Sequence, residues 1–163
     1  MHNSTIWSKT QSLLVFYVYK TEKEFNQFRV SFDEVLNESN VKRIKVVVLI
    51  KDLKQDILRN SLFAYISEKD IHFFTSELRK KAKNEFGYQL DIVRHTAFDL
   101  LLSFGEPTPK VLKWLMKIQV KERIGVNING LKTFDLILQS SKSSISDSVT
   151  FTRDTLIKIK KEE

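Results

Sequence analysis

The feature that most constrains the fold is a pair of similar apolar segments in the second half of the chain. Residues 98–104 read Phe-Asp-Leu-Leu-Leu-Ser-Phe, and residues 134–138 read Phe-Asp-Leu-Ile-Leu. In each segment alternate residues form one wholly apolar face and the other face is mixed, which is typical of strands covered on both sides. We therefore predict two strands at the centre of a sheet, side by side or nearly so, with helices above and below.

The N-terminal half has the strand–helix–strand order of a parallel crossover. Residues 12–19 are aromatic and branched, and residues 44–50 are almost continuously apolar, so both favour strands. Between them, Thr21 and Glu24 have the spacing of a capping box that begins a helix ending near Glu38. This order predicts an α/β sheet with a right-handed crossover.

The remaining elements follow from weaker or more local signals. The middle of the chain predicts a short helix at 52–59, a strand at 62–66, an edge strand or loop at 70–74, a helix at 77–84 and a short strand at 90–93. Thr108 and Pro109 begin a helix that runs to about Gln119. Asn129-Gly130 is the signature of a type I′ hairpin turn, so residues 123–128 and 131–138 are expected to be antiparallel neighbours. A last helix begins near Ile145.

These elements predict one α/β domain over residues 12–163, with a mixed, mainly parallel sheet, helices on both faces, and a C-terminal β-hairpin plus helix. A chain of 163 residues can bury one core of this kind. Residues 1–11 are polar apart from Ile6 and Trp7, and we expect them to form a flexible arm.

The composition excludes several function classes. The chain has no cysteine, which rules out disulfides, thiolate catalysis and cysteine-bound metal sites and fits a reducing compartment. His2, His72 and His95 lack the short spacings of a zinc site, and His72 is expected to be structural. No apolar run approaches the length of a membrane helix. We expect a cytoplasmic protein without membrane contact, metal or cofactor.

The positive charge suggests one candidate binding surface. The net charge is +7, which favours an acidic protein, another polyanion or a nucleic acid as partner, although solubility alone would also explain it. On the helix after Pro109, a basic face is expected at steps of three, four and four residues: Lys110, Lys113, Lys117 and Lys121. Residues 79–83 carry a second basic cluster. No aromatic RNA-stacking motif or DNA-reading module accompanies either cluster.

The carboxyl ends of the predicted strands form the second candidate site, because open α/β sheets bind ligands there. The residues that follow the strands are Thr21, Lys51, Asp52 and Glu106, together with Lys20, Ser103 and Gly105. The helix starts at Thr21 and Thr108 could hold an anion, although ordinary helix capping explains the same residues without a ligand.

Two other patterns resemble sites without satisfying their chemistry. Residues 125–133 (Gly-Val-Asn-Ile-Asn-Gly-Leu-Lys-Thr) differ from a phosphate-binding P-loop because Leu131 separates the second glycine from the lysine and a strand is expected to follow. Asp99 and Asp135 could be a catalytic carboxylate pair, but both begin their strands and so lie at the edge opposite the expected site. We expect both carboxylates to bond backbone N–H groups instead.

The order of these C-terminal motifs resembles a known family. A Phe-Asp-Leu-Leu strand, a proline-containing helix start, a segment ending in Arg123-Ile124-Gly125 and a Phe-Asp-Leu-Ile strand before a terminal helix are similar to an uncharacterised bacterial domain family. The resemblance covers mainly residues 98–159 and more faintly residues 70–73. It implies the same architecture and carries over no functional residue.

Three hypotheses for function remain open. The first is a non-enzymatic binding or interaction domain that uses the basic helix face on an acidic partner. The alternative is a small-molecule or nucleotide-type ligand-binding protein, or a small enzyme, with its site at the carboxyl ends of the strands. A scaffold or oligomer-forming role is the third, and the sequence leaves the oligomeric state open.

Overall fold

The computed structural model describes residues 4–50, 63–75, 97–129, 133–140 and 144–161 of the chain. The helices are α1 (Ile6–Lys9), α2 (Glu22–Asn37), α5 (Pro109–Leu115) and α6 (Ile145–Lys158), with a short 3-10 helix η1 (Glu68–Asp70). The strands are β1 (Ser12–Val18), β2 (Arg43–Ile50), β3 (Ile71–Thr75), β4 (Phe98–Phe104), β5 (Val120–Val126) and β6 (Leu136–Leu138). None of the described helices has the length and apolar run that a membrane crossing requires.

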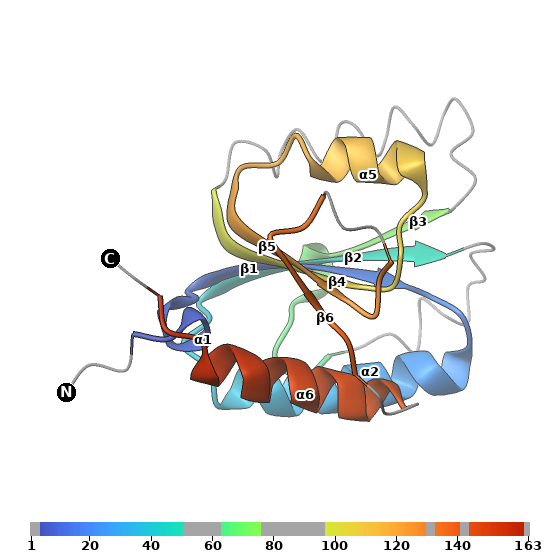
Figure 1. Cartoon of the computed structure of the whole chain (residues 1–163). Coiled ribbons are helices and arrows are strands. Elements are labelled where there is room, and N and C mark those ends of the chain that lie inside the picture. Colours follow the sequence, from blue (N-terminus) through green and yellow to red (C-terminus); the bar gives the residue numbers. More distant parts are fainter. Residues whose placement is uncertain (1–3, 51–62, 76–96, 130–132, 141–143, 162–163) are drawn as a thin grey trace.

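The strands of the described residues form one six-stranded sheet in the order β3-β2-β1-β4-β5-β6. Helices α2 and α6 cover one face and α5 covers the other, as Figure 1 shows. This arrangement confirms the predicted α/β class with helices on both faces. Every neighbouring pair of strands is parallel, so the prediction of a mixed sheet is wrong.

The strand order reverses between β1 and β4. The chain adds β2 and β3 on one side of β1 and then returns to place β4 on the other side, with Val15 opposite Leu102. The crossover helices on either side of such a reversal lie on opposite faces of the sheet, which leaves a crevice at the carboxyl ends of the two central strands. The fold therefore fixes where a ligand site is expected before any side chain is considered.

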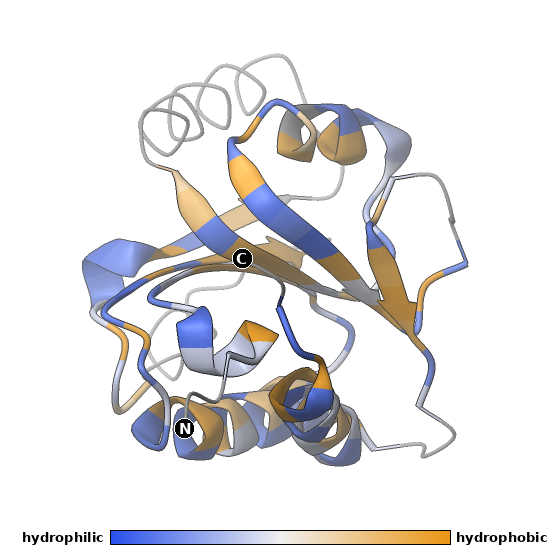
Figure 2. Ribbon diagram, turned by 60° about the vertical axis from the view of Figure 1, so that its left-hand side comes forward, coloured by the Kyte–Doolittle hydropathy of each residue, from blue (hydrophilic) through white to orange (hydrophobic). Residues whose placement is uncertain are grey.

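Apolar side chains on both faces hold the central strands in place. Tyr17 of β1 stacks on Phe28 of α2 with ring centroids 4.3 Å apart, and Phe104 of β4 meets Phe28 edge-on at 5.3 Å. On the other face, Phe16 of β1 belongs to a second buried cluster that includes Val111 of α5. Figure 2 shows the hydrophobic colouring concentrated in the sheet. The two-sided burial predicted for residues 98–104 is confirmed.

The connection from β5 to β6 overturns the predicted hairpin. β6 lies parallel to β5, with Leu136 opposite Ile124, so the chain recrosses the sheet between the two strands. On this path Ile128 and Phe134 are only 2% and 9% exposed. The free energy gained by burying these two apolar side chains exceeds the local preference of Asn129-Gly130 for a hairpin turn. Asn127, at the end of β5, takes the left-handed conformation with φ of 54°.

Several other predicted elements differ from the structure. β6 has three residues at the edge of the sheet, so only the first Phe-Asp-Leu segment is central. Residues 63–66 form a loop with bends at 64–66 and no strand. For residues 70–74, where an edge strand or a loop was expected, the structure has the strand β3. The helix expected to reach Gln119 ends at Leu115. The elements expected at 52–59, 77–84 and 90–93 lie outside the described residues.

The two ends of the described chain lie together at the amino edge of the sheet (Figure 1). Residues 1–11 were expected to be a flexible arm, yet α1 lies within them, and Ile6 and Trp7 are buried in the core. Thr5 forms an antiparallel bridge with Lys160, and the Ile6 N–H donates to the Ile159 carbonyl at 2.9 Å. The N-terminal segment therefore docks against the C-terminal one.

Replacing Gly125 tests the recrossing connection. A Cβ at this position would lie 2.9 Å from Cδ1 of Ile128 and 3.3 Å from the Phe134 ring, so Gly125→Val should lower the free energy of unfolding by about 1–3 kcal/mol. Urea unfolding measures this, and the cost should shrink when Ile128→Ala is combined with it. Equal or higher stability of Gly125→Val would contradict the packing, because valine is favoured in an uncrowded strand.

Candidate functional site

A pocket of about 130 Å³ opens at the carboxyl ends of β1, β4 and β5, beside the starts of α2 and α6. It lies at the reversal of strand order, where the fold predicts a ligand crevice. Apolar side chains line part of it, and its polar side chains are those of Lys20, Glu24, Asn127 and Ser148.

Gly105 allows the ends of β1 and β4 to come close together at this pocket. Its φ is +105°, and a Cβ there would lie 2.8 Å from Cβ of Val18 at the end of β1. The buried Ser103 hydroxyl donates to the Gly105 carbonyl at 2.9 Å and holds the turn. A larger residue would combine a strained backbone with a clash, so glycine is required here.

Glu24 is positioned by both its backbone and its side chain. Thr21 is the N-cap of α2 and its hydroxyl accepts from the Glu24 N–H at 3.1 Å, as predicted. The Glu24 carboxylate accepts a hydrogen bond from the Tyr17 hydroxyl at 3.2 Å, whereas the capping box would have turned it back to the N-cap. Burial and, second, the Glu24 charge raise the pKa of Tyr17, so its phenol remains a hydrogen-bond donor.

Asn127 and Ser148 are already engaged in bonds to neighbouring groups. The Asn127 side-chain N–H donates to the Ser148 hydroxyl at 3.3 Å, while its carbonyl oxygen accepts from the Ser140 N–H at 2.7 Å. The Ser148 hydroxyl in turn donates to the Ser144 carbonyl at 3.2 Å. These contacts join the end of β5 to the start of α6 and close one side of the pocket.

The structure brings together only some of the residues predicted at the strand ends. Lys20 and Gly105 line the pocket, and Thr21 caps the helix beside it. Glu106 is exposed and lines a separate cavity of about 370 Å³, next to Leu112 and Phe134. Lys51 and Asp52 lie outside the described residues. Sequence reasoning assigned no site role to Glu24, Asn127 or Ser148.

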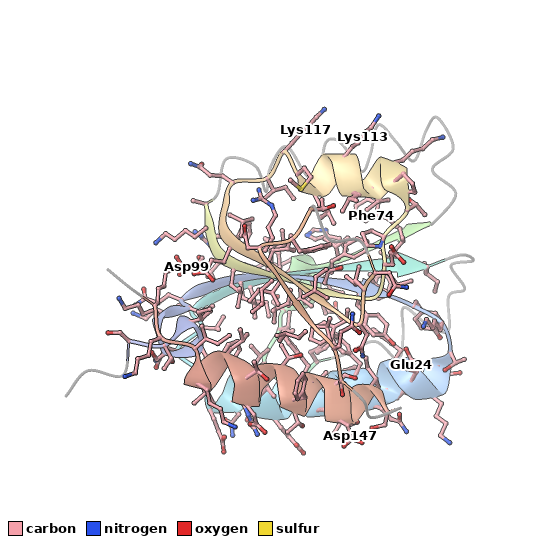
Figure 3. All side chains as sticks on the ribbon, in the orientation of Figure 1. Glu24, Phe74, Asp99, Lys113, Lys117 and Asp147 are labelled. Atoms are coloured by element: carbon pink, nitrogen blue, oxygen red, sulfur yellow. The ribbon has the colours of Figure 1, made fainter. Side chains whose placement is uncertain are left out.

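The predicted row of four lysines is divided in the structure. Lys110 and Lys113 are exposed on α5, and Lys117 follows in the turn after the helix. Figure 3 shows Lys113 and Lys117 projecting away from the sheet. Lys121 belongs to β5 and pairs with Asp99 at 3.2 Å, because the helix ends at Leu115 and the chain turns to begin β5. The second basic cluster, at 79–83, lies outside the described residues.

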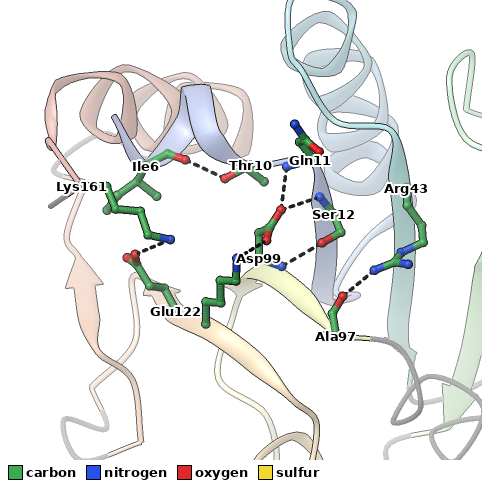
Figure 4. Close-up of polar contacts among 10 residues, drawn as sticks. Ile6, Thr10, Gln11, Ser12, Arg43, Ala97, Asp99, Glu122 and Lys161 are labelled. Carbon is green, nitrogen blue, oxygen red and sulfur yellow. Dashed lines mark hydrogen bonds and ion pairs between the residues drawn. The ribbon is translucent and has the colours of Figure 1, made fainter. Parts of the chain in front are cut away.

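Asp99 and Asp135 each bond to the backbone of a neighbouring segment. Asp99 accepts from the backbone N–H groups of Gln11 at 2.9 Å and Ser12 at 3.1 Å, at the amino edge of the sheet (Figure 4). Asp135 accepts from the Arg123 N–H at 2.7 Å, one strand further along. The predicted bonding of both carboxylates to backbone N–H groups is confirmed.

The charged cluster around His72 offers no metal site. Lys45 and Asp70 form a 2.6 Å ion pair beside His72, and burial, followed by the Lys45 charge, lowers the pKa of His72. Within the described ranges, no three histidine or carboxylate side chains gather where they could hold a metal ion.

Comparison with known proteins shows the fold and no family. No family model matches the chain, and no curated protein matches it. Among solved structures, it is similar to the glycosyl transferase family 9 protein from Veillonella parvula, with a TM-score of 0.57 and 10% sequence identity. The match covers 97% of this chain and 44% of that chain, so this chain spans less than half of the other protein.

The strand order is that of Rossmann-like dinucleotide-binding folds. Those folds place a glycine-rich turn after the first strand, so that the backbone can approach a pyrophosphate. Here residues 19–24, which span the turn after β1 and the start of α2, read Tyr-Lys-Thr-Glu-Lys-Glu and contain no glycine. The chain therefore has the architecture of these proteins without their phosphate-binding turn.

Asp99 should stabilise the amino edge in a pH-dependent way. Burial alone would raise the pKa of Asp99, but hydrogen bonds from the Gln11 N–H, Lys121 and the Ser12 N–H together outweigh it and hold the pKa below the ordinary 3.8. The stabilisation is therefore complete above pH 3.8 and is lost as the pH falls through the lower native pKa.

We expect Asp99→Asn to lower the free energy of unfolding at pH 7 by about 1–3 kcal/mol. Urea unfolding should also show a shallower loss of stability below pH 4 than in the wild type. Glu34→Gln, at an exposed carboxylate of α2, serves as the control. Unchanged stability of Asp99→Asn at pH 7 would show that the network in Figure 4 contributes little.

Proposed function

We propose that the protein is a non-enzymatic binding domain whose ligand is a small polar molecule held in the pocket at the carboxyl ends of β1, β4 and β5. The observation that supports this most strongly is the presence of Lys20 and Glu24 in one pocket at the reversal of strand order. Neither side chain joins neighbouring strands of the sheet. The carboxylates at the amino edge, in contrast, accept hydrogen bonds that hold neighbouring segments together.

The size and charge of the pocket favour a ligand smaller than a nucleotide. Its volume of about 130 Å³ is below the roughly 300–1,000 Å³ common for drug-sized ligands. Glu22 and Glu24 occupy the first turn of α2, where a phosphate would otherwise approach the positive end of the helix. The name of the structurally similar glycosyl transferase adds monosaccharides to the compounds worth testing.

Filling the pocket should abolish ligand binding without unfolding the protein. Ile145 is half-buried in the pocket wall at the start of α6, so Ile145→Trp is expected to place an indole in the cavity and weaken binding at least about tenfold. Ligand-observed NMR with mixtures of amino acids, monosaccharides and hydroxy acids measures this.

Thr150→Trp, at an exposed position of the same helix, is the matched control and should bind as the wild type does. The proposal is rejected if no compound in these mixtures binds the wild-type protein, or if both tryptophan variants bind equally well.

A second candidate function uses the basic surface formed by Lys110, Lys113 and Lys117. The exposure of these three residues on and just after α5 favours an acidic protein or other polyanion as partner. Lys121 is no longer part of this surface, because it pairs with Asp99 at the amino edge.

Polyglutamate binding tests this surface. The double change Lys113→Glu and Lys117→Glu should weaken binding and flatten its dependence on salt, since fewer counterions are exchanged. The control is Lys42→Glu with Lys69→Glu, two exposed lysines elsewhere, which alters the net charge equally. An equal loss of polyglutamate binding in both double variants would indicate an effect of net charge and reject a specific basic surface.

A further inference from the structure

We infer that the ligand of this pocket is a small zwitterion, of the chemical class of the α-amino acids, with its carboxylate on Lys20 and its ammonium group on Glu24. This inference rests on the proposed function and specifies the ligand that the pocket takes. It follows from which side chains in the pocket are charged and have no ion-pair partner among the described residues.

Two of the four polar side chains are already bonded to neighbouring protein groups. Both ends of the Asn127 amide are bonded, to the Ser148 hydroxyl and to the Ser140 N–H. The Ser148 hydroxyl accepts one bond and donates another. A neutral sugar depends on arrays of such neutral donors and acceptors, and here each of these groups is already engaged in the contact between β5 and α6.

Glu24 is a fixed acceptor with room for a cation. The Tyr17 hydroxyl donates to its Oε1 atom, and the Tyr17 ring itself packs against Phe25 and Phe28. Among the described residues, Oε2 of Glu24 has no hydrogen-bond or ion-pair partner. The carboxylate is half-buried, so its orientation is set by the fold and not by solvent. An ammonium group is the complementary ligand.

Lys20 supplies the opposite charge in the same pocket. It follows β1 directly, and no hydrogen bond or ion pair joins its ammonium group to any residue that the structure describes. Lys20 is exposed and Glu24 is half-buried, so a ligand with a single charge gains a charge-assisted hydrogen bond from one of these two groups. A ligand that carries both charges pairs both groups.

The apolar part of the wall limits the ligand to a short side chain. The same pocket is lined by Val18, Phe104, Val126 and Ile145, and its volume of about 130 Å³ leaves little room beyond a compact molecule. We therefore expect L-alanine to bind better than L-tryptophan or L-arginine. Glycine, alanine and serine are the compounds of first choice.

Calorimetry with alanine and its single-charge analogues tests the inference. L-Alanine should bind the full chain at least about tenfold more tightly than L-alaninamide, which lacks the carboxylate, or propionate, which lacks the amine. The Lys20→Met variant should bind alanine only as tightly as the wild type binds alaninamide. The Glu24→Gln variant should bind alanine only as tightly as the wild type binds propionate.

The controls lie on the same turn. Lys23→Met and Glu22→Gln change exposed residues that do not line the pocket, and both should leave alanine binding unchanged. Thermal unfolding of each variant establishes that it is folded. If Glu24→Gln fails to fold, the comparison of wild-type ligands and of Lys20→Met still decides the inference.

The outcomes separate this inference from the proposed function. Binding of D-glucose or propionate with at least the affinity of alanine, lost in Ile145→Trp, would overturn the zwitterion and leave the pocket as the site. Absence of binding by every compound would overturn both. Alanine binding that persists unchanged in Lys20→Met would overturn the assignment of the carboxylate to Lys20.

Discussion

The parallel pairing of β1 with β4 is the constraint on which the rest of the structure depends. It reverses the direction in which strands are added, so helices α2 and α6 lie on one face of the sheet and α5 lies on the other. Burial of both strands on both faces supplies the apolar area that holds this pair at the centre. The same pairing brings Gly105 against Val18 and so creates the pocket.

The polar groups at the two edges of the sheet differ in how fully they are hydrogen-bonded. At the amino edge, Asp99 is bonded to two backbone N–H groups and to Lys121. Its charge therefore helps to hold β4 to the start of β1 and to β5. At the carboxyl edge, Lys20 has no partner among the described residues and Glu24 has one. Groups that remain incompletely bonded at the reversal of a parallel sheet are suited to bind a ligand, which is why the proposed function lies there.

How much could be predicted from the sequence depended on the range of the interactions. The strands at 12–18 and 98–104 and the helix capped by Thr21 follow from local patterns, and the structure confirms them. The Asn129-Gly130 turn was misleading, because its local preference competes with the burial of Ile128 and Phe134. Of the residues predicted at the carboxyl ends of the strands, Lys20 and Gly105 line the pocket. Its other walls come from long-range contacts that no local pattern contains, such as that of Asn127 with Ser148 across 21 positions.

The most direct test of the central pairing is the measurement of nuclear Overhauser effects between backbone protons of β1 and β4. The parallel register places Leu14 beside Leu101 and Phe16 beside Ser103, so contacts between the strands should advance in the same direction along both of them. That pattern would establish the reversal of strand order and the position of the pocket. Contacts that advance in opposite directions, or contacts that pair β4 with a strand other than β1 and β5, would contradict the account.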